Sequence, residues 1–370
     1  MKKKSWFEIE DTSTINSPSL LVYPERIEEN IRAMIAISGS VSNLRPHIKT
    51  HKMKEVVQLQ QRHGIQKFKC ATIAEAELLG QCEAEDILLA LQPVGNNINR
   101  FFQLVRTFPK SRFSTLVDNE FTLSKIAEKA AENSTIASLY LDINSGMNRT
   151  GCLPNQKAEA LYSAMEKNPN IQAMGFHSYD GHLHHSAVNE RTTLCDAAFD
   201  RVINLKKTIK KQGIIVPHII AGGSPTFPMH AKRSGVEASP GTTLLWDARY
   251  ATLFPEMPFL NAAVLLIRIL SKPSENILCF DLGHKSVAPE MSFPRVTILG
   301  LEDAEQISQS EEHLVVQTTR ADEYEVGDTC YAIPVHICPT VAKYEEVITV
   351  SDGRATGSWK VAARNQTITI

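Results

Sequence analysis

The sequence has few cysteines and almost no net charge, and each absence excludes a class of protein. Its seven cysteines are an odd number, lie far apart and include no CxxC pair, which argues against a disulfide framework and against a zinc ribbon. This usage favours a reducing cytoplasm. The 39 basic side chains nearly balance the 41 acidic ones, so nucleic acid and anionic membranes are poor candidate partners.

Long apolar runs are also missing. The most apolar window, residues 262–270, is interrupted by Arg268 and is far shorter than the roughly 20 residues that a membrane span needs. The N-terminal stretch begins with three lysines but has no apolar segment behind them, so it does not have the pattern of a secretory signal. We therefore expect a soluble, cytoplasmic protein that does not bind membranes.

The length and the recurrence of short apolar runs predict a barrel. A chain of 370 residues is too long for one ordinary core, so one large and one smaller domain are expected. Through the first two thirds of the chain, β-rich runs alternate with helix-like segments, one of which begins at Thr72 and Glu75 with the spacing of a capping box. Eight such strands are typical of a closed parallel barrel, and a doubly wound open sheet is the alternative. The expected strands are 44–49, 67–72, 86–91, 112–117, 137–143, 172–179, 215–222 and 237–245.

The pattern changes after about Pro255. From there, strand-like stretches follow one another with turns such as Ser351-Asp352-Gly353 between them, which predicts an all-β domain. We assign residues 15–255 to an α/β, TIM-like (β/α)8 barrel, and residues 256–370, together with 1–14, to a smaller all-β domain. The strands expected in the second domain are 263–270, 277–281, 296–299, 314–318, 330–333, 346–350 and 359–362.

The first expected strand carries the first candidate for chemistry. Because side chains alternate along a strand, Arg45, His47 and Lys49 share one face. One interpretation is an exposed edge strand. The other is an amine at the C-terminal end of a barrel strand, where the active sites of that fold gather. Burial and neighbouring cations can lower the pKa of such a lysine enough for it to form a Schiff base.

A glycine-rich loop follows the seventh expected strand. Residues 221–226 read Ala-Gly-Gly-Ser-Pro-Thr. Glycines let backbone N–H groups approach an anion, and the loop after strand seven of a barrel is a frequent phosphate site. An ordinary strand-to-helix turn is the alternative, and Pro225 removes one donor from the loop.

Two further loops carry polar side chains. Arg149 lies after the fifth expected strand and stays protonated, so it suits a carboxylate or a phenolate oxygen, although exposed loop arginines are common. The sixth strand ends in the run 177–185, in which His177 and Tyr179 share a face and His182 follows. The histidines of this run suggest metal ligands, and a solvated loop is the simpler interpretation for the last two.

The second domain contains one possible metal-binding pair. In an extended segment His336 and Cys338 point the same way, so one metal ion could accept an imidazole nitrogen and a thiolate from them. A buried cysteine beside an incidental histidine is the alternative.

Taken together, these residues resemble the family of D-threonine aldolases and eukaryotic-type D-serine dehydratases, within the alanine-racemase-like pyridoxal-phosphate (PLP) enzymes. The matching features run nearly from end to end of the chain. They are Ser17-Pro18-Ser19-Leu20-Leu21-Val22 with Asn30-Ile31, the block 45–52, the block 71–77, Gly146 with Arg149 and Gly151, Tyr179 with Gly181-His182, Gly222-Gly223-Ser224, Pro240-Gly241, and His336-Ile337-Cys338-Pro339.

The resemblance implies a PLP barrel followed by a β domain, usually in a head-to-tail homodimer with two active sites between subunits. Lys49 would hold the cofactor as a Schiff base, and Arg149 and Tyr179 would lie near its ring. The residues that would hold its phosphate are Gly222, Gly223 and Ser224.

The resemblance also implies a divalent metal at His336 and Cys338 that reaches the β-hydroxyl of the substrate. A thiolate favours zinc over manganese or magnesium. Aldolases of the family can carry an aspartate where this chain has Cys338, and zinc is associated with the dehydratases.

The implied activity is that of a metal-assisted lyase acting on 3-hydroxy-D-amino acids. The run from Tyr179 to His182 favours the D-threonine aldolase type, which releases an aldehyde and glycine. A D-serine or 3-hydroxy-D-aspartate dehydratase, which gives a 2-oxo acid and ammonia, is the alternative. An amino-acid racemase or a non-catalytic PLP carrier are further alternatives, but a racemase has no use for a metal at the β-position and carriers resemble the barrel alone. The catalytic candidates are Lys49, Arg149, Tyr179 and His182.

Overall fold

A computed structural model describes residues 5–370, which divide into two compact units. The barrel unit consists of residues 34–49, 57–241 and 365–370. The β unit consists of the described residues up to 33, then 50–56 and 242–364. The domain limits expected from the sequence, 15–255 and 256–370 with 1–14, stay a prediction, and their first four residues lie outside the described part of the chain.

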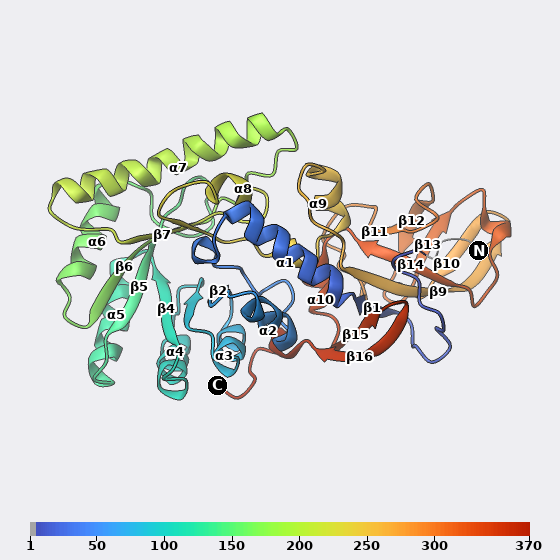
Figure 1. Cartoon of the computed structure of the whole chain (residues 1–370), viewed down its shortest axis with the longest axis horizontal. Coiled ribbons are helices and arrows are strands. Elements are labelled where there is room, and N and C mark those ends of the chain that lie inside the picture. The colour runs from blue at the N-terminus through green and yellow to red at the C-terminus, as the bar shows by residue number, and fades with distance from the viewer. Residues whose placement is uncertain (1–4) are drawn as a thin grey trace. The chain divides into compact units, whose positions relative to one another are not determined.

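The barrel unit contains a parallel sheet of seven strands in the order of the sequence, and four of them run side by side in Figure 1 as β4 to β7. Its strands are buried because helices alternate with them, as in α/β folds generally. The strands are β2 (Lys67–Cys70), β3 (Asp86–Leu89), β4 (Arg112–Val117), β5 (Ala137–Asp142), β6 (Ile171–Ser178), β7 (His218–Ala221) and β8 (Val236–Ala238). The helices are α3 (Ile73–Gln81), α4 (Asn96–Thr107), α5 (Glu120–Glu132), α6 (Gln156–Lys167), α7 (Val188–Lys211) and α8 (Phe227–His230).

The sequence predicted the class of this fold and most of its strands. Strand β4 begins and ends at the expected residues, and Thr72 caps α3 by accepting a hydrogen bond from the Glu75 backbone N–H. Strand β8 was predicted to continue to residue 245, but it ends at Ala238. Pro240 and Gly241 follow, and neither residue type extends a strand.

The first expected strand, 44–49, is not a regular strand but still connects the two edges of the sheet. Leu44 forms a parallel bridge with Ala238 of β8, and His47 forms one with Lys69 of β2. Pro46 supplies no N–H, although its carbonyl accepts a bond from Lys69. The segment is buried, so the interpretation as an exposed edge strand is wrong.

Arg45 occupies the interior of the barrel unit as a paired cation. Its side chain is 1% exposed and forms ion pairs with Asp86 of β3 and Glu237 of β8. Lys67 also contacts Glu237, and Arg112 contacts Asp86. Burial would raise the pKa of Asp86, but Arg45 outweighs it and holds that pKa below its ordinary value. The network therefore keeps a set of charges stable inside the barrel.

The β unit is built on a sheet of nine strands, and its two unexpected strands have weak sequence signals. β1 (Ser19–Val22) is only four residues long but lies between β9 and β15, whereas β12 (Glu305–Gln309) is an edge strand with polar residues. The other strands are β9 (Ala263–Ser274), β10 (Ile277–Phe280), β11 (Val296–Ile298), β13 (Leu314–Gln317), β14 (Thr329–Pro334), β15 (Glu346–Ser351) and β16 (Arg354–Lys360).

This unit is mainly β rather than all-β, because the short helices α9 (Ala248–Leu253) and α10 (Ile337–Val341) belong to it. The remaining helices of the chain are α1 (Pro24–Ser38) and α2 (Lys54–Arg62). Between residues 5 and 370, no helix combines the length and the apolar character that crossing a membrane requires.

Replacing Arg45 with methionine tests the buried charge network. The variant leaves Asp86 and Glu237 without their main partner, so the free energy of unfolding should fall by about 3–5 kcal/mol. Arg112→Met is the matched control, because Arg112 contacts the same Asp86 but is 77% exposed. It should cost less than about 1 kcal/mol in urea unfolding followed by circular dichroism. Equal losses in the two variants would contradict the importance of burial.

Candidate active site

Three cationic side chains of the barrel unit converge on the ring of Tyr179, which directly follows β6. Lys49 Nζ lies 5.5 Å from the ring centroid, Lys69 Nζ 5.7 Å and Arg149 Cζ 4.8 Å. They come from the bridging segment 44–49, from β2 and from the loop after β5. The C-terminal ends of parallel strands meet on one side of a barrel, which explains why residues so far apart in sequence gather here. The sequence predicted Lys49, Arg149 and Tyr179 as site residues, but not Lys69.

These three cations are unpaired. With residues 5–370, the side chains of Lys49, Lys69 and Arg149 form no hydrogen bond and no ion pair. Burial lowers the pKa of Lys69 to about 7, and the charge of Lys49 adds to this effect. A cluster of cations without carboxylate partners attracts an anion, and an amine among other cations is a candidate nucleophile.

A buried histidine faces the same region. Asp142 of β5 and His177 of β6 form a hydrogen bond of 2.7 Å between Oδ1 and Nδ1. Burial would raise the pKa of Asp142, but His177 outweighs it and the pKa is lowered. The Nε2 atom of His177 is buried and has no partner among the described residues. The alternation of His177 with Tyr179 in the sequence was the only signal for it.

The glycine loop after β7 fits closely around Tyr179. A Cβ atom on Gly223 would lie 2.9 Å from the Tyr179 ring, and one on Gly222 would lie 2.5 Å from His230. Gly222 also has φ +81°, a conformation that favours glycine. Its N–H already donates to the Ser178 carbonyl, so its contribution is conformational. The Gly223 N–H is likewise engaged, because it donates to the Thr226 hydroxyl. The role of all three residues in holding a phosphate therefore stays a prediction.

His182 lies against Gly146, where a Cβ atom would come within 3.0 Å of its Nε2. Burial lowers the pKa of His182, and His184 and His185 add to that effect. Its Nδ1 is buried without a partner among residues 5–370. The ring is therefore expected to be a neutral donor or acceptor rather than a cation at neutral pH.

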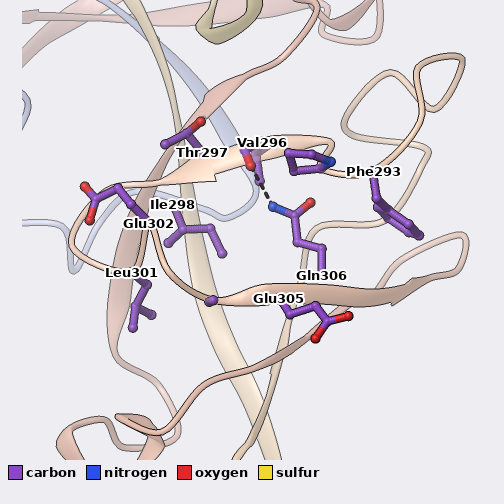
Figure 2. A pocket seen from close by; sticks show the side chains of 10 residues that line it. Phe293, Val296, Thr297, Ile298, Leu301, Glu302, Glu305 and Gln306 are labelled. Carbon is purple, nitrogen blue, oxygen red and sulfur yellow. Dashed lines mark hydrogen bonds between the residues drawn. The ribbon is translucent and has the colours of Figure 1, made fainter. Parts of the chain in front are cut away.

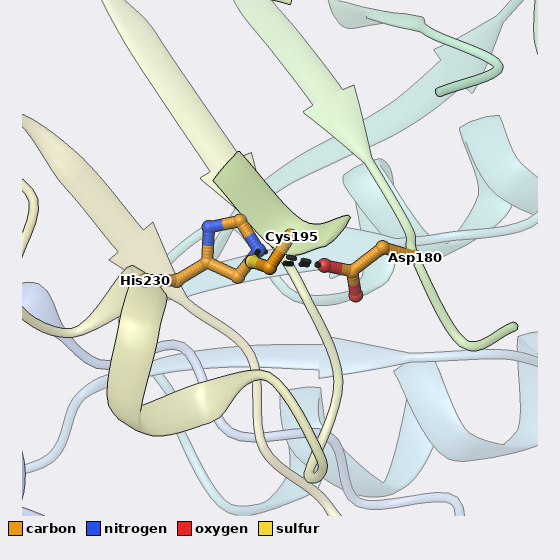
Figure 3. Close-up of side chains that lie close together, drawn as sticks. All are labelled: Asp180, Cys195 and His230. Carbon is orange, nitrogen blue, oxygen red and sulfur yellow. Dashed lines mark hydrogen bonds and ion pairs between the residues drawn. The ribbon is translucent and has the colours of Figure 1, made fainter. Parts of the chain in front are cut away.

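A second cluster in the barrel unit has the composition of a metal site. Asp180, Cys195 and His230 are all buried, and their ligand atoms lie within 4.8 Å of one another. Figure 3 shows the carboxylate and the thiol on the same side of the imidazole. His230 Nε2 is 2.8 Å from Asp180 Oδ2 and 3.5 Å from Cys195 Sγ.

The hydrogen bonds of this cluster favour a structural network over a metal site. Arg233 Nη1 lies 2.6 Å from His230 Nδ1, and because a guanidinium only donates, the ring proton belongs on Nε2, facing Asp180. A metal at Nε2 would require that proton on Nδ1, where it would face the Arg233 N–H. Burial also raises the pKa of Cys195 to about 12, which keeps it a thiol. The network holds the glycine loop, since Thr226 joins Asp180 to the Gly223 N–H.

The β unit contains the predicted pair His336 and Cys338. These residues were expected in an extended segment, but His336 caps the short helix α10 and Cys338 lies in its first turn, so that expectation is wrong. Their side chains still lie close enough to shift the pKa of each other. Burial would raise the pKa of Cys338, but His336 outweighs it and the pKa is lowered. A thiolate beside an imidazole is a donor set that zinc accepts.

Neighbouring groups orient this pair. Glu290 contacts His336 Nδ1, which directs the Nε2 lone pair to a metal, as carboxylates commonly do for histidine ligands. The hydroxyls of Thr50 and Thr242 lie 3.1 and 3.5 Å from Cys338 Sγ. The residues present therefore fit a divalent metal, and Glu290 and the two threonines were not predicted because they lie far from the pair in sequence.

A hollow in the β unit, shown in Figure 2, has a different character. Gln306 donates to the Val296 carbonyl at 2.6 Å along one side of it. Its charged lining residues are Glu302 and Glu305, so it repels a phosphate and offers no amine. The residues that line it are Phe293, Pro294, Val296, Thr297, Ile298, Leu301, Glu302, Ala304, Glu305 and Gln306.

Comparison with known families divides the chain into two matched regions. Residues 22–248 match the alanine racemase N-terminal domain, and residues 262–350 match a serine dehydratase domain. The first match covers more than half of the chain.

Individual relatives extend over nearly the whole chain. It is 26% identical to the D-threonine aldolase of an Arthrobacter species, over 95% of this chain and 93% of that protein. It is 24% identical to the 3-hydroxy-D-aspartate aldolase of Paracoccus denitrificans strain Pd 1222, over 96% and 94%. The crystal structure of the D-threonine aldolase of Filomicrobium marinum is similar with a TM-score of 0.87 and 22% identity, over 94% of this chain and 96% of that one.

Metal analysis of variants separates the two candidate centres. If His336 and Cys338 hold the metal, the purified protein should contain about one zinc per chain and the double variant His336→Ala/Cys338→Ala almost none. Cys195→Ala, which removes the thiol of the buried network, should retain the metal. Inductively coupled plasma mass spectrometry measures all three. Retention in the double variant with loss in Cys195→Ala would assign the metal to the Asp180 cluster instead.

Proposed function

The chain belongs to the family defined by the alanine racemase N-terminal domain, and a serine-dehydratase-type domain follows that domain in the sequence. From this premise we propose that the protein is a PLP-dependent lyase acting on 3-hydroxy-D-amino acids. The observation that carries this proposal is the convergence of the unpaired cations Lys49, Lys69 and Arg149 on Tyr179. This arrangement offers an amine for the aldehyde of the cofactor and positive charge for its anionic groups.

Each predicted residue then has a defined part in binding the cofactor. Lys49 Nζ forms the covalent link, and Tyr179 and Arg149 lie beside it at the C-terminal ends of the strands. Gly222, Gly223 and Ser224 of the loop after β7 are the residues that we propose to hold the phosphate. Their fit is supported by the close approach of Gly223 to Tyr179, which leaves no room for a larger side chain.

Bound PLP supplies an electron sink for a bond broken at the α-carbon of the substrate. The chain's own contribution is the movement of protons. When Lys49 is not bonded to the cofactor, the free amine of Lys49 would take or return a proton at Cα. His182, with an Nδ1 that has no partner among residues 5–370, is a further candidate to hold a proton of the substrate.

A divalent metal, with zinc favoured over manganese or magnesium because of the thiolate, would polarise the β-oxygen of the substrate. His336 and Cys338 are its proposed ligands. Glu290 fixes the orientation of the imidazole, and the hydroxyls of Thr50 and Thr242 form hydrogen bonds with the sulfur that help to lower the pKa of Cys338. Their contacts support a thiolate, which is the form of cysteine that binds metals.

Among the possible lyase reactions we favour the D-threonine aldolase type, which cleaves Cα–Cβ and gives glycine and an aldehyde. The similarity to two aldolases and the run from Tyr179 to His182 support it. The dehydratase-type second domain and Cys338 support the alternative, elimination to a 2-oxo acid and ammonia. A cytoplasmic homodimer is the form that we propose for the enzyme.

The covalent link is tested by reduction with borohydride and peptide mapping. The reduced cofactor should be found on Lys49, because this amine lies among other cations beside Tyr179. Lys49→Ala should abolish the visible absorption of the cofactor, whereas Lys52→Ala, three residues away in the same block, should retain it. A label on Lys52 or Lys69, or on no lysine, would refute the assignment.

The reaction type is tested by the products of D-threonine and of its β-phenyl analogue. We expect glycine and the corresponding aldehyde, identified by mass spectrometry, and no reaction with the L-enantiomers. The bond broken at Cα is the one aligned with the electron sink, and the binding contacts of the substrate decide which one that is. Release of ammonia and a 2-oxo acid without glycine would establish the dehydratase instead.

A further inference from the structure

Lys69 is a buried member of the cation cluster at Tyr179, and the proposed function gives it no contact of its own. Both of its backbone groups are bonded to the segment 44–49, because its N–H donates to Pro46 and its carbonyl accepts from Ile48. The residue is only 2% exposed. Its Nζ atom reaches the ring of Tyr179, 5.7 Å from the centroid, in the same cluster as Lys49.

The lack of a partner distinguishes Lys69 from two other cations of the barrel unit, Arg45 and the partly exposed Lys67. A buried charge is normally paired or hydrogen-bonded. Arg45, which is equally buried, contacts two carboxylates, and Lys67, two residues earlier in the same strand, contacts Glu237. Lys69 forms no hydrogen bond or ion pair with any residue in the range 5–370.

The nearest carboxylates are already engaged. Asp142 is bonded to His177, and Asp180 is bonded to His230 and Thr226. Both act on Lys69 only through space. The barrel therefore positions an ammonium group beside Tyr179 but supplies no anion to contact it.

We propose that Lys69 is an anion-binding residue of the active site, whose ammonium contacts an oxyanion of the bound cofactor or the carboxylate of the amino-acid substrate beside Tyr179. This inference rests on the proposed function, because it takes the pocket at Tyr179 as the place where PLP binds. The pKa of about 7, which burial and Lys49 give this lysine, means that an arriving anion also stabilises the charged form.

The test uses the full-length chain with four variants: Lys69→Met, Lys69→Gln, Lys69→Arg and, as a control on the same strand, Lys67→Met. The dissociation constant of PLP is measured by absorbance titration, and the visible band of the loaded protein is titrated against pH. The dependence of turnover on D-threonine concentration is measured in parallel. Urea unfolding of the unloaded protein reports on structure alone.

Loss of a hydrogen bond to a charged group should weaken binding about ten-fold or more. If the oxyanion belongs to the cofactor, Lys69→Met raises the PLP dissociation constant and moves the pH midpoint of the visible band. If it is the substrate carboxylate, PLP binds normally, KM rises and kcat changes little. In both cases Lys69→Arg retains much of the affinity, Lys67→Met binds as the wild type does, and Lys69→Met is no less stable to urea.

The proposal is overturned if Lys69→Met matches the wild type in the PLP dissociation constant, the pH midpoint and KM. Lys69→Gln is measured if the methionine variant does not fold, and failure of both to fold would also refute it, because it would make Lys69 structural. The proposed function has its own readout. A wild-type chain that binds no PLP refutes that function, whereas normal binding with an unaffected Lys69→Met refutes only the role of Lys69.

Discussion

Four backbone hydrogen bonds hold the lysine-bearing segment in the barrel unit, and the geometry of the candidate site depends on them. Arg45 donates to Ala238, the last residue of β8, and His47 donates to Pro240 just after it. On the other side, Ile48 donates to Lys69 of β2, and Lys69 donates back to Pro46. They fix the position at which Lys49 leaves the segment and that of the second lysine at the same time. This short connection between the two edge strands therefore holds Lys49 beside Lys69 at Tyr179.

The cations inside the barrel unit differ in whether they have a carboxylate partner. Arg45 is surrounded by carboxylates, and this network satisfies its charge within the protein. Near the C-terminal ends of the strands, the carboxylates are bonded to histidines, and the lysines are left unpaired. The same residue types are therefore structural in one region and available for a ligand in the other, and the difference lies only in which partners are already taken.

The sequence alone predicted those elements whose signal lies in a few neighbouring residues. Strand β4 follows from a continuous β-rich run, and the cap of α3 follows from Thr72 and Glu75. Lys69 could not be singled out from the sequence, because Lys67 and Lys69 lie two residues apart in β2 and so share one face of the strand. The two lysines differ in the contact of Lys67 with Glu237, which is 170 residues away in the sequence. His336 and Cys338 were paired on the assumption of an extended segment, whereas a helix cap brings them together.

The irregular segment 44–49 also has a thermodynamic consequence. It is joined to its neighbours by isolated bridges rather than by a continuous ladder, so detaching it from either neighbour would break only two backbone hydrogen bonds. A ligand bonded to Lys49 and also held by the loop after β7 would connect the segment 44–49 to another strand of the sheet. Occupancy of the site would then be coupled to the resistance of the barrel to heat, since binding to the folded state alone raises the free energy of unfolding.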